Sequence, residues 1–205
     1  MTDARAQLLM DRVEIAQLLQ SWGMWRDGGD WDRLRSAYTA DATMVVSWFD
    51  GLADDFIDRC ILLRERSLRA ETQSLSHHLV GGAAIDVRGD RAVADTRVTI
   101  MMRFDVHGIE CDVTAIGRFF DLLTRVDGNW RIHRRVAVFE KDTLRAVNPE
   151  KNITVDEAQL ARFPTGYRYT AYAMAARGIE VSDAMPGSTA ASQAELRASG
   201  TAWLA

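Results

Sequence analysis

A change of hydrophobic period near residue 73 constrains the fold of this 205-residue chain more than any other feature. From there on, apolar residues recur at every second position, most clearly over 91–106, where charged residues occupy the alternate positions. Turn signals at Arg88-Gly89-Asp90, Val106-His107-Gly108 and Asp127-Gly128-Asn129 divide this region at hairpin spacing. The pattern predicts long antiparallel strands over about 74–88, 91–106, 109–126 and 129–141.

The residues before this region have helical periodicity instead. Thr2 or Asp3 can cap a first helix that runs to about Asp27, where Gly28-Gly29 stops it. A short helix to about Tyr38, a strand over 43–49 and a helix over about 53–68 follow. Helices first and a strand meander afterwards indicate an α+β fold, with helices packed on one face of a curved antiparallel sheet.

Two irregularities in the strands predict bulges. Gly81-Gly82 interrupts the first long strand, and the apolar parity of 109–126 switches near Phe119-Phe120. Bulges bend a sheet and re-aim its side chains, so a sheet bent in this way can enclose a pocket.

The composition changes after about residue 145, which predicts two parts: a domain over 1–145 and a C-terminal extension over 146–205. Prolines punctuate the extension, and short helices are expected near 155–161, 165–177 and 190–199. Its apolar residues predict packing on the domain or on a neighbouring subunit. A lid over the pocket mouth is the alternative.

Charge and composition exclude several classes of partner. The net charge is −4, the pI is about 5.6, and no basic stripe is present, which argues against a nucleic-acid partner. No apolar run approaches the roughly 18–20 residues that span a bilayer, so no membrane partner is expected. The two cysteines are not spaced as a metal or redox motif, and no signal peptide is apparent, which together predict a cytoplasmic protein.

Asp27 and His78 are the main catalytic candidates. A carboxylate that orients an imidazole makes a general base that can remove a proton from carbon without metal or cofactor, so no cofactor is expected. The alternative for Asp27 is a surface ion pair with Arg26 or Arg33. His77 and His78 are adjacent in a strand and point to opposite faces, which argues against a shared metal ion, and no metal site is predicted.

Three segments resemble the SnoaL-like families of the nuclear transport factor 2 superfamily. The stretch 27–35 and the segment His78-Leu79-Val80-Gly81-Gly82 are similar to segments of scytalone dehydratase. The run from Asp127 to Arg135 is similar to the final strand of hexachlorocyclohexane dehydrochlorinase. The resemblance covers about residues 8–141 and implies a cone-shaped α+β barrel with a helical C-terminal extension.

In both relatives an aspartate–histidine pair at the positions of Asp27 and His78 drives elimination. The resemblance therefore implies that His78 is the base, that Asp27 orients it, and that Arg135 assists the leaving group. Strand alternation puts Trp130, Ile132, Val136 and Val138 on one face and Arg135 on the other, away from the pocket, unless a bulge intervenes. Arg118, Asp121 and Arg134 are expected to be charges on the sheet surface.

The match to scytalone dehydratase is partial. That enzyme polarises its substrate through two tyrosines, whereas Arg26 precedes Asp27 here and the strand near Val46–Trp48 has no tyrosine. Its serine and asparagine pair is also replaced, around Gly117 and Phe119. The comparison implies that the base persists and that the electrophilic side of the site has changed.

These observations predict a cofactor-independent lyase of the dehydratase or elimination type, acting on a small hydrophobic, cyclic or aromatic substrate. An isomerase, a cyclase or a retro-aldol, deformylating lyase with the same base is the first alternative, and a non-catalytic ligand-binding or oligomerisation module is the second. A homodimer or homotrimer is expected through the outer face of the sheet. Large apolar side chains are the candidates for substrate contact: Trp22, Trp25, Tyr38, Trp48, Met102 and Phe119.

Overall fold

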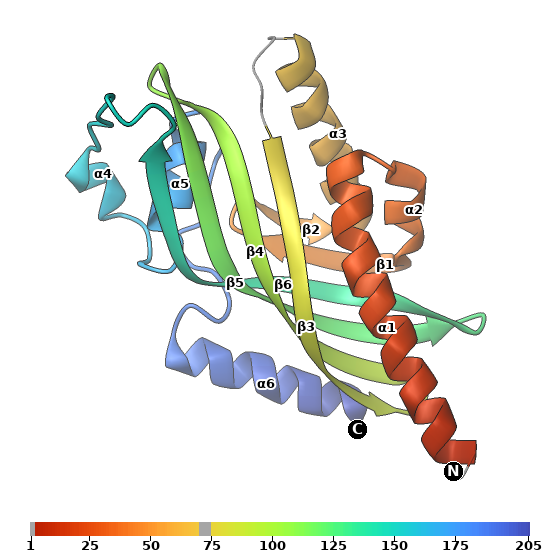
Figure 1. The fold of residues 1–205 in the computed structure, drawn as a ribbon. Helices are drawn as coiled ribbons and strands as arrows, with labels where there is room; N and C mark the ends of the chain where they lie inside the picture. Colours follow the sequence, from red (N-terminus) through yellow and green to blue (C-terminus); the bar gives the residue numbers. More distant parts are fainter. Residues whose placement is uncertain (1–2, 70–74) are drawn as a thin grey trace.

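The computed structural model describes residues 3–69 and 75–205 and confirms the predicted order of the helices and of the four long strands (Figure 1). The single strand predicted over 43–49 is instead two strands, Tyr38–Val46 and Phe49–Leu52, and the short helix before them ends at Ser36. Helices precede a meander of long strands, and a helical extension follows it. The predicted cap Thr2 and the strand start at residue 74 lie outside the described residues. The N-terminal helices are α1 (Asp3–Gly28), α2 (Trp31–Ser36) and α3 (Ala53–Arg69).

A six-stranded curved sheet in the order β2-β1-β6-β5-β4-β3 forms the centre of the molecule. The four long strands pair antiparallel as predicted, whereas β1 pairs with β6 in parallel. The sheet is therefore mixed, and it is open because β2 and β3 form its two edges. The strands are β1 (Tyr38–Val46), β2 (Phe49–Leu52), β3 (Leu75–Arg88), β4 (Arg91–Val106), β5 (Ile109–Val126) and β6 (Asn129–Ala146).

The bulge predicted at Gly81-Gly82 is present, because the register of β3 against β4 shifts between Val80 and Ala83. In β5 the register against β6 shifts on either side of the predicted position, between Ile116 and Gly117 and between Leu122 and Leu123.

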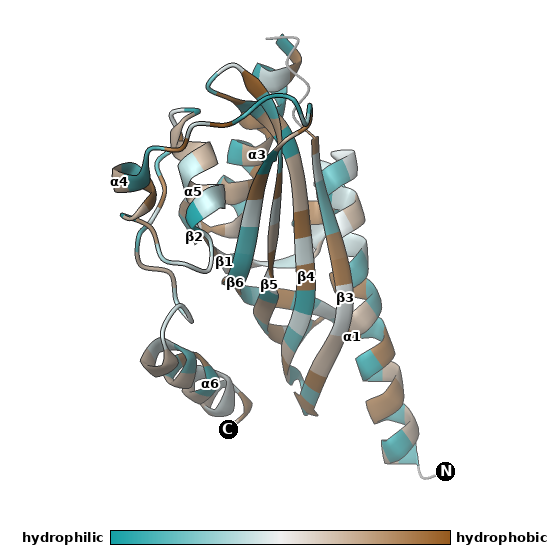
Figure 2. Ribbon diagram, turned by 60° about the vertical axis from the view of Figure 1, so that its left-hand side comes forward, coloured by the Kyte–Doolittle hydropathy of each residue, from teal (hydrophilic) through white to brown (hydrophobic). Residues whose placement is uncertain are grey.

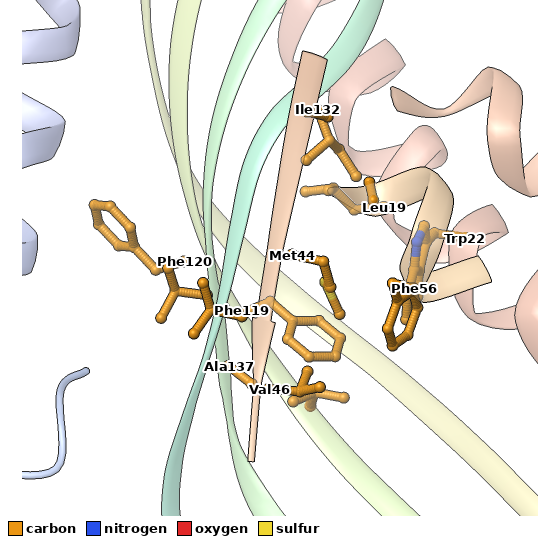
Figure 3. Close-up of a cluster of buried hydrophobic side chains, with 14 of the residues drawn as sticks. Leu19, Trp22, Met44, Val46, Phe56, Phe119, Phe120, Ile132 and Ala137 are labelled. Carbon is orange, nitrogen blue, oxygen red and sulfur yellow. The ribbon is translucent and has the colours of Figure 1, made fainter. Parts of the chain in front are cut away.

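The parity change at Phe119-Phe120 reflects burial of both faces of the sheet (Figure 3). Phe119 points toward Trp22 of α1, whereas Phe120 points to the other side of β5. There Gly200 of α6 lies so close that an added Cβ would be 2.8 Å from the Phe120 ring. A strand covered on both faces carries apolar residues at successive positions, which hides its alternation.

Helix α1 is anchored to the sheet at two places along its 26 residues. Near its start, the buried Asp11 accepts hydrogen bonds from Arg125 of β5 (2.6 Å) and from Trp130 of β6 (3.4 Å). Near its end, Gly23 packs directly on β3, where an added Cβ would lie 3.1 Å from the carbonyl oxygen of His78. These anchors bring the last turn of α1, which carries Asp27, against β3.

The C-terminal extension packs on two parts of the sheet (Figures 1 and 2). Figure 2 shows α6 and α1 on opposite sides of the strands, while α5 lies near the end of β6. Leu196 of α6 and Tyr167, just before α5, belong to the same buried cluster as Ile15 of α1. The extension comprises α4 (Glu157–Leu160), α5 (Arg168–Ala175) and α6 (Ala190–Leu204).

The first two of these helices are shorter than the sequence predicts, and α6 runs further, to Leu204. Pro164 follows α4 by four residues and restricts the chain before it. Gly178, with a φ of +73°, turns the chain after α5.

Candidate active site

Asp27 and His78 meet where the last turn of α1 crosses β3. One carboxylate oxygen of Asp27, Oδ1, lies 2.7 Å from Nδ1 of the imidazole. The other, Oδ2, accepts the backbone N–H of His78 at 2.6 Å. Both side chains are nearly buried, at 8% exposed for His78 and 15% for Asp27. This double contact holds the imidazole at Nδ1, and Nε2 has no protein hydrogen-bond partner within residues 3–69 and 75–205.

The surroundings of the pair favour a charged carboxylate beside a neutral imidazole. Burial alone would raise the pKa of Asp27, but the hydrogen bonds from His78 and the charge of Arg26 lower it below its usual value. Burial lowers the pKa of His78, the hydrogen bond to Asp27 opposes this, and the nearby Arg26 and Arg135 lower it further. A neutral histidine with a free nitrogen is the form that accepts a proton.

A cavity of about 580 Å³ opens beside the pair. The volume lies in the range of pockets for small organic ligands, roughly 300–1,000 Å³. Four of the predicted substrate contacts line this cavity, and Figure 3 shows two of them, Trp22 and Phe119, beside Met44 and Phe56. The four are Trp22, Trp48, Met102 and Phe119.

Two predicted contacts do not line the cavity. Tyr38 is buried behind Trp22, and its hydroxyl accepts a hydrogen bond from Trp22 Nε1 at 2.7 Å. It borders a separate surface hollow of about 630 Å³ that contains neither Asp27 nor His78. Trp25 is partly buried and packs against the main core cluster. Tyr38 therefore supports the cavity wall, and Trp25 belongs to the core.

Arg135 points to the inner face of the sheet because β6 carries an extra residue. Leu122 of β5 pairs with Arg134 and Leu123 pairs with Ile132, so His133 bulges out between them. The bulge reverses the alternation, and it places Arg135 on the same face as its partner across the sheet, Asp121. Arg135 still alternates with Val136 and Val138, but the bulge puts those two valines on the opposite face from Trp130 and Ile132, which the expected alternation had grouped with them.

Arg135 nevertheless lies behind the cavity wall. Its guanidinium carbon is 4.4 Å from the centres of both the Trp22 and the Phe119 rings. Asp121 holds the guanidinium with two hydrogen bonds of 2.7 and 2.9 Å, and both residues are 0% exposed. Burial alone would lower the pKa of Arg135, but the charge and hydrogen bonds of Asp121 outweigh it and raise the pKa.

This buried pair corrects one expectation, because Asp121 is not a charge on the sheet surface. The sequence does not show that Arg135 would arrive opposite it after a bulge and pair with it in the core.

Several cavity residues were not predicted. Arg26 and Arg64 come from the N-terminal helices, and Thr170, Met174 and Arg177 come from the C-terminal extension. Arg26 directly precedes Asp27, so its position was a usable signal. The tail residues lie far from the other motifs in sequence, and nothing in their spacing indicates a pocket.

The described residues contain no group of three or more histidine, cysteine, aspartate or glutamate side chains placed to hold a metal ion. Cys60, which lines the cavity, and Cys111 are both buried and free. Among the described helices, none is both long and apolar enough to cross a membrane.

Comparison with known proteins identifies the family of this chain. Residues 7–136 match the model of the SnoaL-like domain. Over 183 residues the chain is 33% identical to pea pathogenicity protein 2 of Fusarium vanettenii, which covers 88% of this chain and 76% of that protein.

Solved structures share the fold. A putative scytalone dehydratase from Novosphingobium aromaticivorans superimposes with a TM-score of 0.57 at 18% identity, over 73% of this chain and 99% of that one. A hexachlorocyclohexane dehydrochlorinase gives a TM-score of 0.57 at 15% identity, over 74% of this chain and 99% of that one. The α+β architecture expected from the sequence is therefore the architecture of these enzymes' fold.

Proposed function

The chain belongs to the SnoaL-like family, and from that premise we propose that it is a cofactor-independent lyase of the elimination type, with His78 as general base. One observation carries the proposal: Asp27 engages both Nδ1 and the backbone amide of His78 beside a cavity that is lined mainly, though not entirely, by apolar side chains. The folds of a dehydratase and a dehydrochlorinase are consistent with it. The substrate is a small hydrophobic, cyclic or aromatic molecule that fits about 580 Å³.

In the proposed step, Nε2 of His78 removes a proton from a carbon next to an activating group. The electron pair of the broken C–H bond forms a double bond while the leaving group departs with its own pair. Asp27, bound to Nδ1–H, holds the tautomer with a basic Nε2 and stabilises the imidazolium that forms. Isomerisation, cyclisation and retro-aldol cleavage require the same base and differ in the fate of the electron pair.

Negative charge that develops on the substrate requires a cationic or hydrogen-bonding partner. Arg26 lines the cavity next to Asp27 and is a direct candidate. Arg135 lies behind Trp22 and Phe119, so its proposed assistance acts through its field and not through contact.

The test measures proton exchange in deuterated water with a panel of cyclic ketones such as 2-tetralone, followed by NMR. The wild-type protein should exchange α-protons faster than buffer for at least one member. His78→Ala should lose about 100- to 10,000-fold of that rate, the usual contribution of a general base.

The matched control is His133→Asn, because His133 also faces an aspartate, Asp41, at 3.5 Å but lies on the surface away from the cavity. This variant should exchange at the wild-type rate. If His78→Ala exchanged as fast as wild type, His78 would not be the base. Retained binding with no exchange for any ketone would favour the non-catalytic ligand-binding module.

A further inference from the structure

One face of helix α5 and the turn after it forms part of the cavity wall. Thr170, Met174 and Arg177 are spaced at i, i+4 and i+7, the positions that share one face of a helix, and all three line the cavity. They lie beyond residues 7–136, which match the family model. The C-terminal extension therefore contributes its own side chains to the cavity wall.

These contacts include unused polar groups. The backbone N–H of Thr170 donates to Asp142 at 2.6 Å, while its Oγ1 is buried without a hydrogen-bond partner in the described part of the chain. The Arg177 guanidinium stacks 4.5 Å from the centre of the Phe104 ring and forms no ion pair with any described residue. Asp105 accepts the N–H of Gly108 in the β4–β5 turn. Burial lowers the pKa of Arg177 more than the charge of Asp105 raises it.

The charges that line the cavity are unbalanced. Its described lining contains three arginines, Arg26, Arg64 and Arg177, and a single carboxylate, Asp27, which is bound to His78. Arg64 donates to the backbone oxygen of Asp27 at 3.1 Å and forms no ion pair within residues 3–69 and 75–205. A cationic cavity in a protein of net charge −4 favours an anionic ligand.

The sheet register gives the separation between Arg177 and the base. His78 of β3 pairs with Ile100 of β4, and the Phe104 that Arg177 covers lies four residues further along β4. At about 3.3 Å per residue, the two positions are roughly 13 Å apart along the strand. A molecule with two rings and a terminal anionic group can span this distance.

We propose that Arg177 is a specificity-determining residue that binds the carboxylate of an apolar, two-ring substrate at the end of the cavity away from His78. The assignment of this molecule as a substrate rests on the proposed function, because that function requires its other end to react at His78. The carboxylate site itself rests only on the residues that line the cavity.

The experiment compares binding of biphenyl-4-carboxylate with that of the neutral biphenyl-4-carboxamide by isothermal titration calorimetry. The wild-type protein should prefer the carboxylate. Arg177→Gln should weaken carboxylate binding about 10- to 100-fold, the size of a lost charge-assisted hydrogen bond, and leave amide binding unchanged. Arg177→Lys should retain part of the preference. Arg162→Gln, on an exposed arginine of the extension outside the cavity lining, should match wild type.

Equal wild-type affinity for the acid and the amide would overturn the proposal, as would equal weakening of both in Arg177→Gln. His78→Ala keeps Arg177, so it should keep the preference for the acid. A protein that shows the preference but no proton exchange would therefore contradict the proposed base and leave the carboxylate site standing.

Discussion

The Trp22 ring lies between two pairs of a basic side chain and a carboxylate, His78–Asp27 and Arg135–Asp121, which have similar contacts and different roles. The edge contact of its ring with His78, at 5.5 Å between centroids, lies on the cavity side, and Arg135 packs over the ring at 4.4 Å on the core side. In each pair the carboxylate accepts two short hydrogen bonds from the basic residue. Only the pair containing His78 borders the cavity.

The difference between the pairs lies in what remains free after the carboxylate is bound. A guanidinium has no acceptor nitrogen and keeps its proton, so the Arg135–Asp121 pair cannot act as a base; it fills and braces the core. An imidazole bound at Nδ1 still has Nε2, and burial lowers the pKa of His78, which favours the neutral form that can accept a proton there. The buried carboxylate of Asp121 thus stabilises the core, whereas the carboxylate of Asp27 orients an imidazole whose Nε2 stays basic.

The largest expected effect comes from Asp27→Asn. The asparagine amide can donate to Nδ1, which stabilises the tautomer with a protonated Nε2 and removes the base. We expect proton exchange to fall about 10,000-fold, as for a triad aspartate changed to asparagine. Circular dichroism and thermal melts should show a folded protein. A loss below tenfold would mean that Asp27 does not control the tautomer.

Next in size is Asp121→Asn, which should lower the free energy of unfolding by about 3–5 kcal/mol because it leaves the charge of Arg135 buried and unpaired. Urea denaturation measures this. The double variant Asp121→Leu with Arg135→Met removes both charges and should recover much of the loss. A double variant as unstable as the single one would show that the unpaired charge is not the cause.

We expect the His78–Asp27 pair to set the pH dependence of proton exchange and to contribute to that of stability. Because the pKa of His78 is lowered on folding from 6.5, the unfolded chain binds more protons as the pH falls below 6.5, and stability decreases there. Exchange should stay constant above pH 6.5 and decline only below it. In Arg26→Gln the decline should begin at higher pH, since Arg26 opposes protonation of His78. An unchanged profile in this variant would contradict that role.

The smallest expected effect is that of Tyr38→Phe, which acts on the wall between the pairs. It removes the 2.7 Å hydrogen bond from Trp22 Nε1 and leaves a buried N–H unpaired. We expect a loss of about 1–3 kcal/mol in stability and less than tenfold in exchange. A loss of more than tenfold in the exchange rate would mean that the orientation of Trp22 controls the position of His78.

Local patterns predicted most of the fold. The turn signals at 88–90, 106–108 and 127–129 place the hairpins correctly, and Gly81-Gly82 predicts the bulge in β3. These features succeed because they act between neighbours in sequence. The parallel pairing of β1 with β6 has no such signal, since β2, α3 and the strands β3 to β5 separate the two strands in sequence.

The sequence by itself determined an α+β chain with long antiparallel strands, a carboxylate at the end of the first helix and a histidine on the first long strand. Only the tertiary structure decided that these two residues meet, that the His133 bulge turns Arg135 into the core, and that Arg177 of the extension reaches the cavity. Local periodicity specifies the face of each element. Contacts between residues tens of positions apart depend on how the sheet bends and on which helices cover it.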